Sequence, residues 1–168
     1  MEKYVVSARK YRPTKFEDVI GQNHVTTTLK NAIKNNKVAQ SLLFCGPRGV
    51  GKTTCARILA NEINGFNIND PLDSSNNLNI YELDAASNNS VDDIRSLIDQ
   101  VRYAPQAGKY KVYIIDEVHM LSNAAFNAFL KTLEEPPSYA IFILATTEKN
   151  KVIPTILSRC QIYDFNRI

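Results

Sequence analysis

The sequence predicts an α/β fold, in which a five-stranded and mostly parallel sheet lies between two layers of helices. Two observations carry this prediction. Short apolar runs that suit buried strands alternate with segments whose apolar residues recur every three to four positions, as on one face of a helix. Successive strands separated by helices are joined by crossovers, so the alternation indicates βαβ units and parallel pairing.

The length and composition are those of one ordinary globular domain. The chain has 168 residues, 44% of them apolar and 22% charged, and its net charge of +3 is too small to indicate nucleic-acid binding. No apolar stretch is long enough to span a membrane, and the start of the chain does not resemble a signal peptide. Cys45, Cys55 and Cys160 are far apart, which favours reduced thiols in a cytoplasmic protein over a disulfide framework or a metal site.

The first third of the chain is expected to contain an arm, a helix and a strand. Pro13 disfavours helix at Arg12, so we expect residues 1–20 to form an extended arm. Apolar residues recur every four positions over 22–35, which predicts an amphipathic helix. A strand over 40–45 follows.

The next segment, Gly46–Thr53, matches the phosphate-binding pattern G-x-x-x-x-G-K-[ST], the P-loop. Its glycines permit a tight turn in which backbone N–H groups face a polyphosphate. Lys52 supplies a charge for the β- and γ-phosphates, and the Thr53 hydroxyl is placed to bind Mg²⁺. A chance match is the alternative, but a strand before the loop and a helical pattern over 54–63 supply the context that the motif requires. The residues assigned to nucleotide binding here are Gly46, Pro47, Arg48, Gly49, Val50, Gly51, Lys52, Thr53 and Thr54.

An Asn-rich stretch separates the two halves of the chain. Residues 64–79 contain six Asn, two Asp and two Ser and have little to bury, so we expect a loop. A strand is predicted over 80–84. A helix should then begin at Ser90, because Asp93 stands three positions later as its capping-box partner.

The last part of the chain continues the alternation. Residues 111–116 contain a run of apolar and β-branched residues, which is typical of a strand buried on both faces of a parallel sheet. Ser122 is expected to cap the next helix, and Pro136 to end it. The remaining elements are strands at 140–145 and 161–165 and a short helical turn at 154–157.

Two acidic residues, Asp116 and Glu117, end the most apolar strand. Ligands of such sheets bind at the carboxyl ends of the strands, so this pair should face the P-loop. Asp116 would hold Mg²⁺ through water, and Glu117 would orient the water that attacks the γ-phosphate. Alone, the pair would indicate only an acidic strand end near a turn, but the intact P-loop favours the catalytic interpretation.

Four further residues stay open on spacing alone. Thr146 and Thr147 end the next strand, where a hydroxyl can contact the γ-phosphate or its attacking water, or simply belong to a solvated turn. For Arg159, spacing alone favours a surface charge over a site residue. His119 is expected to pack or to make a structural hydrogen bond rather than to act in catalysis.

The order of these motifs resembles the bacterial DNA polymerase III gamma/tau subunits, the AAA+ ATPases of the replicative clamp loader. The resemblance extends from Tyr11 onward, and two of its motifs, Glu134–Pro137 and Ser158–Cys160, are specific to clamp loaders. It implies a P-loop NTPase fold of the AAA+ type with three α/β/α layers. The segments that carry it are Gly46–Thr53, Leu83–Ser87, Ile115–Leu121, Leu130–Pro137, Ala145–Thr147 and Ser158–Cys160.

Roles follow from the resemblance, position by position. Lys52 and Thr53 would be Walker A, Asp116 and Glu117 Walker B, and Thr147 sensor one. Arg159 would be the arginine finger, which serves the site of a neighbouring subunit. The residues that would help to enclose the adenine are Tyr11, Arg12, Pro13, Val19 and Ile20.

The sequence departs from the family pattern in two places. The Asn-rich stretch 64–79 stands where family members usually carry a four-cysteine zinc module, and it contains no cysteine, so we expect no zinc. The family's helical lid and collar domain are not found in these 168 residues. We therefore expect residues 1–168 to be the AAA+ nucleotide-binding domain, the first domain of a longer protein.

The resemblance implies an ATP- and Mg²⁺-dependent motor that loads the sliding clamp onto primed DNA for DNA polymerase III in the cytoplasm. Its implied partners are the delta and delta prime subunits, the sliding clamp and, through the assembled complex, primer-template DNA; no membrane is expected. The full-length protein would be a hetero-oligomer, and the isolated domain a monomer. The alternatives are a clamp-loader scaffold subunit that does not hydrolyse ATP, and another AAA+ DNA remodeller or branch-migration motor. The intact catalytic motifs argue against the first, and the clamp-loader motifs against the second.

Overall fold

One sheet of five strands forms the centre of the molecule. The computed structural model describes residues 13–65, 79–105 and 109–167. Every neighbouring pair of strands is parallel, in the order β2-β3-β4-β1-β5, so the predicted α/β fold class is confirmed and the sheet is parallel throughout. The strands are β1 (Ser41–Cys45), β2 (Ile80–Asp84), β3 (Lys111–Asp116), β4 (Ala140–Thr146) and β5 (Gln161–Asp164).

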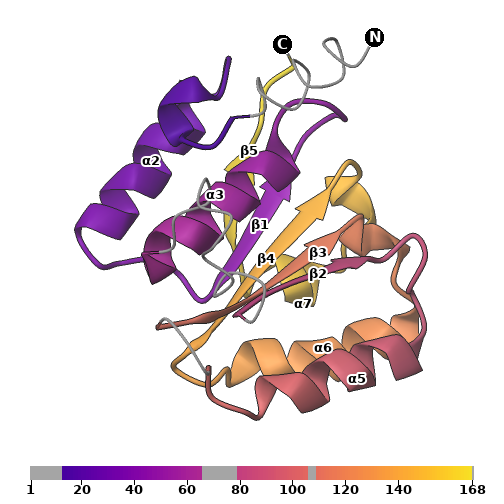
Figure 1. Ribbon diagram of the computed structural model, residues 1–168. Helices are drawn as coiled ribbons and strands as arrows, with labels where there is room; N and C mark the ends of the chain where they lie inside the picture. Colours follow the sequence, from indigo (N-terminus) through magenta and orange to yellow (C-terminus); the bar gives the residue numbers. More distant parts are fainter. Residues whose placement is uncertain (1–12, 66–78, 106–108, 168) are drawn as a thin grey trace, which may run out of the picture.

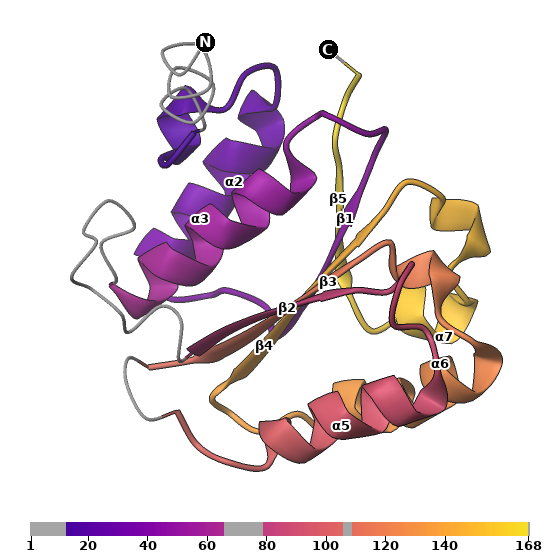
Figure 2. The ribbon, with the colours of Figure 1, turned by 45° about the vertical axis from the view of Figure 1, so that its right-hand side comes forward.

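Helices cover both faces of this sheet, as Figures 1 and 2 show. One face carries α2 (Asn23–Lys34) and α3 (Lys52–Asn64). The opposite face carries α5 (Val91–Val101), α6 (Asn123–Glu134) and α7 (Pro154–Leu157). In the described part of the chain, three short 3-10 helices connect the elements, namely η1 (Phe16–Asp18), η2 (Val118–Met120) and η3 (Lys149–Lys151). Among the described residues, no helix has both the length and the apolar character needed to cross a membrane.

The strands bury side chains on both faces, which produces two cores. Along β1, Leu42 and Phe44 contribute to the core beneath α2 and α3, whereas Leu43 and Cys45 contribute to the core beneath α5, α6 and α7. This alternation follows from the two-residue period of a strand. Because every residue of β1 is buried, the strand appears in the sequence as an unbroken apolar run.

The N-terminal arm differs from the prediction. Residues 16–18 form a 3-10 turn instead of extended chain, because this turn places the Phe16 side chain, 1% exposed, in the core beneath α2 and α3. Residues 1–12 lie outside the described residues, and so do residues 66–78 of the Asn-rich stretch.

The chain that leaves β5 returns to the start of the P-loop. The Phe165 N–H donates to the Cys45 carbonyl at 2.7 Å. A β-carbon added to Gly46 would lie 2.8 Å from the Phe165 carbonyl oxygen, so only glycine allows this approach. The Gln22 amide donates to the Asn166 carbonyl at 2.7 Å and accepts from the Asn166 N–H at 2.8 Å. The first P-loop residue and the residue before α2 therefore both contact the segment that follows β5.

Candidate nucleotide site

The P-loop connects β1 to α3 and takes the shape that its glycines permit. Gly49 and Gly51 have φ angles of 77° and 100°, which other residues rarely adopt. Gly51 is the N-cap of α3 and provides no side-chain hydrogen bond. Without such a cap, the first N–H groups of the helix remain available, and together with the helix dipole they favour a bound anion.

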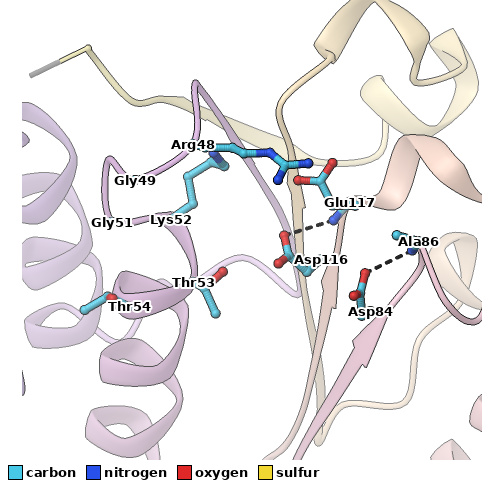
Figure 3. Close-up of a pocket in the computed structure, with 10 residues that line it drawn as sticks. All are labelled: Arg48, Gly49, Gly51, Lys52, Thr53, Thr54, Asp84, Ala86, Asp116 and Glu117. Atoms are coloured by element: carbon cyan, nitrogen blue, oxygen red, sulfur yellow. Dashed lines mark hydrogen bonds between the residues drawn. The ribbon is translucent and has the colours of Figure 1, made fainter. Parts of the chain in front are cut away.

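A cleft of about 510 Å³ lies between this loop and the carboxyl ends of β2 and β3 (Figure 3). The structure therefore brings together the P-loop and the Asp116–Glu117 pair, which are distant in sequence. Arg48 extends across the cleft toward Glu117 (Figure 3). The lining residues are Arg48, Gly49, Gly51, Lys52, Thr53, Thr54, Asp84, Ala86, Asp116 and Glu117.

Lys52 is buried inside the loop that it belongs to. Only 7% of the residue is exposed, and its Nζ donates to the carbonyls of Gly46 at 2.5 Å and Pro47 at 2.6 Å. Burial lowers the pKa of the ammonium, and the carboxylates of Glu117 and Asp116 partly oppose this. The ammonium is thus held at the cleft by groups that a phosphate can replace as hydrogen-bond acceptors.

Asp116 lies at the end of β3 among other acids. Burial raises the pKa of its carboxyl, a hydrogen bond from the Glu117 N–H at 2.9 Å opposes the rise, and the charges of Glu117 and Asp84 add to it. A cation beside Asp116 would favour the ionised form. Mg²⁺ prefers oxygen ligands and uses one or two carboxylates together with substrate phosphates. The Asp116 carboxylate and the Thr53 hydroxyl suit this ion.

Glu117 has an unusual backbone conformation for a residue that is not glycine. Its φ and ψ are 53° and 45°, in the left-handed region. Its side chain is 16% exposed, and its Oε2 accepts a hydrogen bond from the Thr147 hydroxyl at 3.2 Å. Glu117, to which we assigned the attacking water, is thus in contact with Thr147, which the resemblance identifies as sensor one.

A second hollow, of about 330 Å³, adjoins the P-loop on the side of the N-terminal arm. Pro13, Val19 and Ile20 line it together with Asp18 and the loop residues Gly49, Val50, Gly51 and Thr54. The arm residues assigned to the adenine therefore lie beside the loop. Tyr11 and Arg12, assigned to the same group, lie outside the described residues.

Arg159 is placed differently from the other predicted residues. It follows α7, lies outside the lining of the cleft, and its side chain is 50% exposed. Its Nη2 lies 3.5 Å from Glu134 Oε1, the only ion pair found for it among the described residues. The structure does not bring Arg159 to the site of its own chain.

Sequence reasoning missed Asp84. This residue ends β2 and pairs in register with Asp116, so its carboxylate lines the same cleft. Its Oδ1 accepts from the Ala86 N–H at 3.0 Å. A signal was present in the sequence, since Asp84 ends a predicted strand as Asp116 does, but the pairing of the two strands was not predicted.

No zinc cluster is found in the part of the chain that the structure describes, where no three His, Cys, Asp or Glu side chains are grouped for a metal. Since residues 66–78 lie outside that part, the absence of zinc stays a prediction. Metal analysis of protein purified without added zinc should give well under one equivalent, because the usual site has four Cys or His ligands at short spacing.

The family model for "DNA polymerase III, delta subunit" matches residues 21–168. This chain belongs to that family. Curated relatives of the family carry tau and gamma names. "DNA polymerase III subunit tau" of Bacillus subtilis is 52% identical over 178 residues, which cover 98% of this chain and 31% of the relative. The protein of the same name in Escherichia coli K12 is 48% identical and covers 94% of this chain and 26% of the relative. The gamma/tau resemblance predicted from the motifs is confirmed, and the chain spans about a quarter to a third of these relatives.

Solved structures of the same shape support the fold. A "DNA polymerase III, gamma subunit-related protein" of Thermotoga maritima superimposes with a TM-score of 0.67 at 26% identity, over 83% of this chain and 46% of that one. The RuvB Holliday junction branch migration motor of the same organism gives a TM-score of 0.69 at 24% identity, over 93% of this chain and 49% of its own. The second likeness concerns the fold alone, and it supports the three-layer α/β architecture.

Proposed function

We propose that residues 1–168 form one nucleotide-binding domain that binds ATP with Mg²⁺ and hydrolyses it as the motor of a bacterial clamp loader. One observation carries the ATPase proposal. Lys52 and Thr53 of the P-loop face Asp116 and Glu117 across a single cleft. A loop for phosphates, a site for a cation and a carboxylate for water are the parts that phosphoryl transfer to water requires.

Each residue has a separate task in this proposal. Lys52 and the first N–H groups of α3 bind the β- and γ-phosphates, and Pro13, Val19 and Ile20 enclose the adenine with Tyr11 and Arg12. Thr53 and Asp116 would hold Mg²⁺, which neutralises charge on the phosphate oxygens when bound. Glu117 orients the attacking water and accepts its proton, and Thr147 holds the carboxylate in place.

The family membership supports the biological setting that we propose. The relatives are subunits of DNA polymerase III, so the full-length protein would work within a complex of several subunits. We propose that this complex includes delta and delta prime subunits, and that it loads a sliding clamp onto primed DNA in the cytoplasm. Arg159 would complete the site of the neighbouring subunit.

A scaffold subunit that does not hydrolyse ATP has less support. Such a subunit has no need of Glu117, yet here the carboxylate is held by Thr147 and its backbone occupies a strained conformation. Backbone strain of this kind persists only where the surroundings fix it, and it is concentrated at active sites.

The Glu117→Gln variant tests the proposal in the assembled complex. It removes the proton acceptor and keeps the shape of the side chain, so turnover should fall by about 10²- to 10⁴-fold. Affinity for a fluorescent ATP analogue should stay near that of wild type. The exposed Glu135→Gln serves as the matched control. Wild-type turnover in the Glu117→Gln complex would show that hydrolysis does not use this carboxylate.

A further inference from the structure

A buried imidazole connects Glu117 to the end of β4. His119 lies in η2, and its side chain is 6% exposed. Its Nδ1 lies 2.8 Å from the hydroxyl oxygen of Thr146, the last residue of β4. Its Nε2 lies 3.4 Å from Glu117 Oε2. The ring therefore spans the distance between the sheet and the carboxylate that we propose as the base.

One arrangement of protons satisfies the hydrogen bonds around the ring. The Glu148 N–H donates to Thr146 Oγ1 at 2.9 Å, so the hydroxyl can give its own proton to His119 Nδ1. A neutral imidazole that accepts at Nδ1 carries its proton on Nε2. In this arrangement the proton is on the nitrogen that lies 3.4 Å from Glu117 Oε2, which accepts only. The Glu148 N–H and the Thr146 hydroxyl then each have an acceptor, and Glu117 Oε2 lies 3.4 Å from the remaining donor nitrogen.

Glu117 Oε2 thus faces two donors from two different elements. The Thr147 hydroxyl donates to it from the segment after β4, and His119 Nε2 lies 3.4 Å from it on η2. With Oε2 engaged in this way, Oε1 remains for water. The Nε2–Oε2 distance is long for a hydrogen bond, as such contacts often are before substrate binds.

We infer that His119 is a positioning residue for hydrolysis, which fixes the Glu117 carboxylate relative to Thr146 so that Oε1 faces the attacking water. The inference rests on the proposed function, since it requires Glu117 to be the base. The inference also explains why a histidine stands at this position. A side chain that only filled space would not need a polar partner at each of two nitrogens, Thr146 at Nδ1 and Glu117 at Nε2. The site geometry therefore depends on β4 as well as on the P-loop.

Two substitutions at His119 separate positioning from packing. Glutamine reaches as far as Nε2, so His119→Gln keeps a donor for Glu117. Asparagine reaches only as far as Nδ1, so His119→Asn keeps a partner for Thr146 and loses the donor to Glu117. Both variants should be made in the full-length protein and measured in the assembled complex.

The two variants should differ in kcat and agree in ATP affinity. Misplacing a catalytic group by about 1 Å costs up to about 10²-fold, so we expect His119→Asn to lower kcat by about 10- to 100-fold. His119→Gln should retain most of the wild-type kcat. Affinity for a fluorescent ATP analogue and thermal unfolding should change little in both. Equal kcat losses in the two variants would overturn the inference, and so would wild-type kcat in His119→Asn.

A double-variant cycle tests whether His119 acts through Glu117. In the Glu117→Gln background, adding His119→Asn should cause little further loss, because the group that His119 positions is already absent. A loss as large as in the wild-type background would overturn the inference, whereas wild-type turnover of Glu117→Gln alone would instead overturn the proposed function.

Thr146 supplies a second route to the same result if His119→Asn does not fold. Thr146→Val keeps the shape but removes the hydroxyl that donates to Nδ1, whereas Thr146→Ser keeps the hydroxyl. Thr146→Val should lower kcat more than Thr146→Ser at equal ATP affinity. Equal kcat values for these two variants would contradict the connection from β4 to Glu117.

Discussion

Lys52 and Arg159 are the two cationic side chains assigned to hydrolysis, and they differ in burial and in their position relative to the cleft. Lys52 is 7% exposed and is held by two carbonyls of its own loop, at the edge of its own cleft. Arg159 has a half-exposed side chain, lies outside that cleft and contacts Glu134 at 3.5 Å.

The difference reflects where each charge would act. A cation that serves its own site can be buried during folding, and the cost in solvation appears as the lowered pKa of Lys52. A cation that serves a neighbouring subunit must stay accessible until that subunit arrives. In one chain it therefore has the appearance of an ordinary surface charge.

The largest expected effect comes from Arg159→Ala in the assembled complex. Arginine fingers are worth about 10³–10⁵ in rate, so turnover should fall steeply. ATP affinity should change little, because the guanidinium would contact charge that develops on a neighbour's γ-phosphoryl oxygens. Steady-state turnover and binding of a fluorescent ATP analogue measure the two quantities.

Mixed complexes show whether Arg159 acts on a neighbour. Subunits with Arg159→Ala keep Glu117, and subunits with Glu117→Gln keep Arg159, so a mixture should recover part of the activity. If mixed complexes form and yet stay as inactive as either parent, Arg159 does not act on the site of a neighbouring subunit.

Lys52→Ala should produce the next largest effect, and it should be in binding. Without the ammonium, phosphate oxygens lose a charged hydrogen bond in a partly dehydrated site, worth about 2–3 kcal/mol. This corresponds to roughly 30- to 150-fold in Kd. Titration of the ATP analogue against the chain itself is sufficient, and equal affinities of variant and wild type would refute the P-loop assignment.

The smallest effect should come from Glu134→Ala. The ion pair with Arg159 is exposed on both sides, and such pairs contribute about 0–1 kcal/mol. Urea unfolding of the chain should give a free energy of unfolding close to wild type, with Glu135→Ala as the exposed neighbouring control. A loss well above this range would mean that Arg159 has a structural task in its own chain.

Local signals in the sequence predicted the elements well. The strands over 80–84 and 111–116 were predicted with the bounds that the structure shows. For 111–116 the signal is a continuous apolar run, which marks a strand buried in a parallel sheet. The capping box of Ser90 and Asp93 is confirmed as well. Each of these features depends on residues that are close in the sequence, so tertiary contacts were not needed to recognise them.

Pairings between distant segments were not predictable in the same way. The strand order places Asp84 beside Asp116, and no local pattern contains that order. His119 was expected to pack or to make a structural hydrogen bond, and the bond to Thr146 confirms this, but its partner lies 27 residues away. The 3-10 turn of the arm arises because Phe16 enters a core built by other segments. These features depend on register and packing, which the spacing of residues does not specify.

The contact between Gly46 and Phe165 couples the position of the P-loop to the segment that follows β5. Since a β-carbon on Gly46 would lie 2.8 Å from the Phe165 oxygen, the loop cannot shift toward the end of β5 without displacing it. Gln22 holds the next residue, Asn166, by both its N–H and its carbonyl. Closely packed groups transmit small displacements instead of absorbing them. If the loop moves when it binds phosphate, Phe165 and Asn166 would therefore have to move with it.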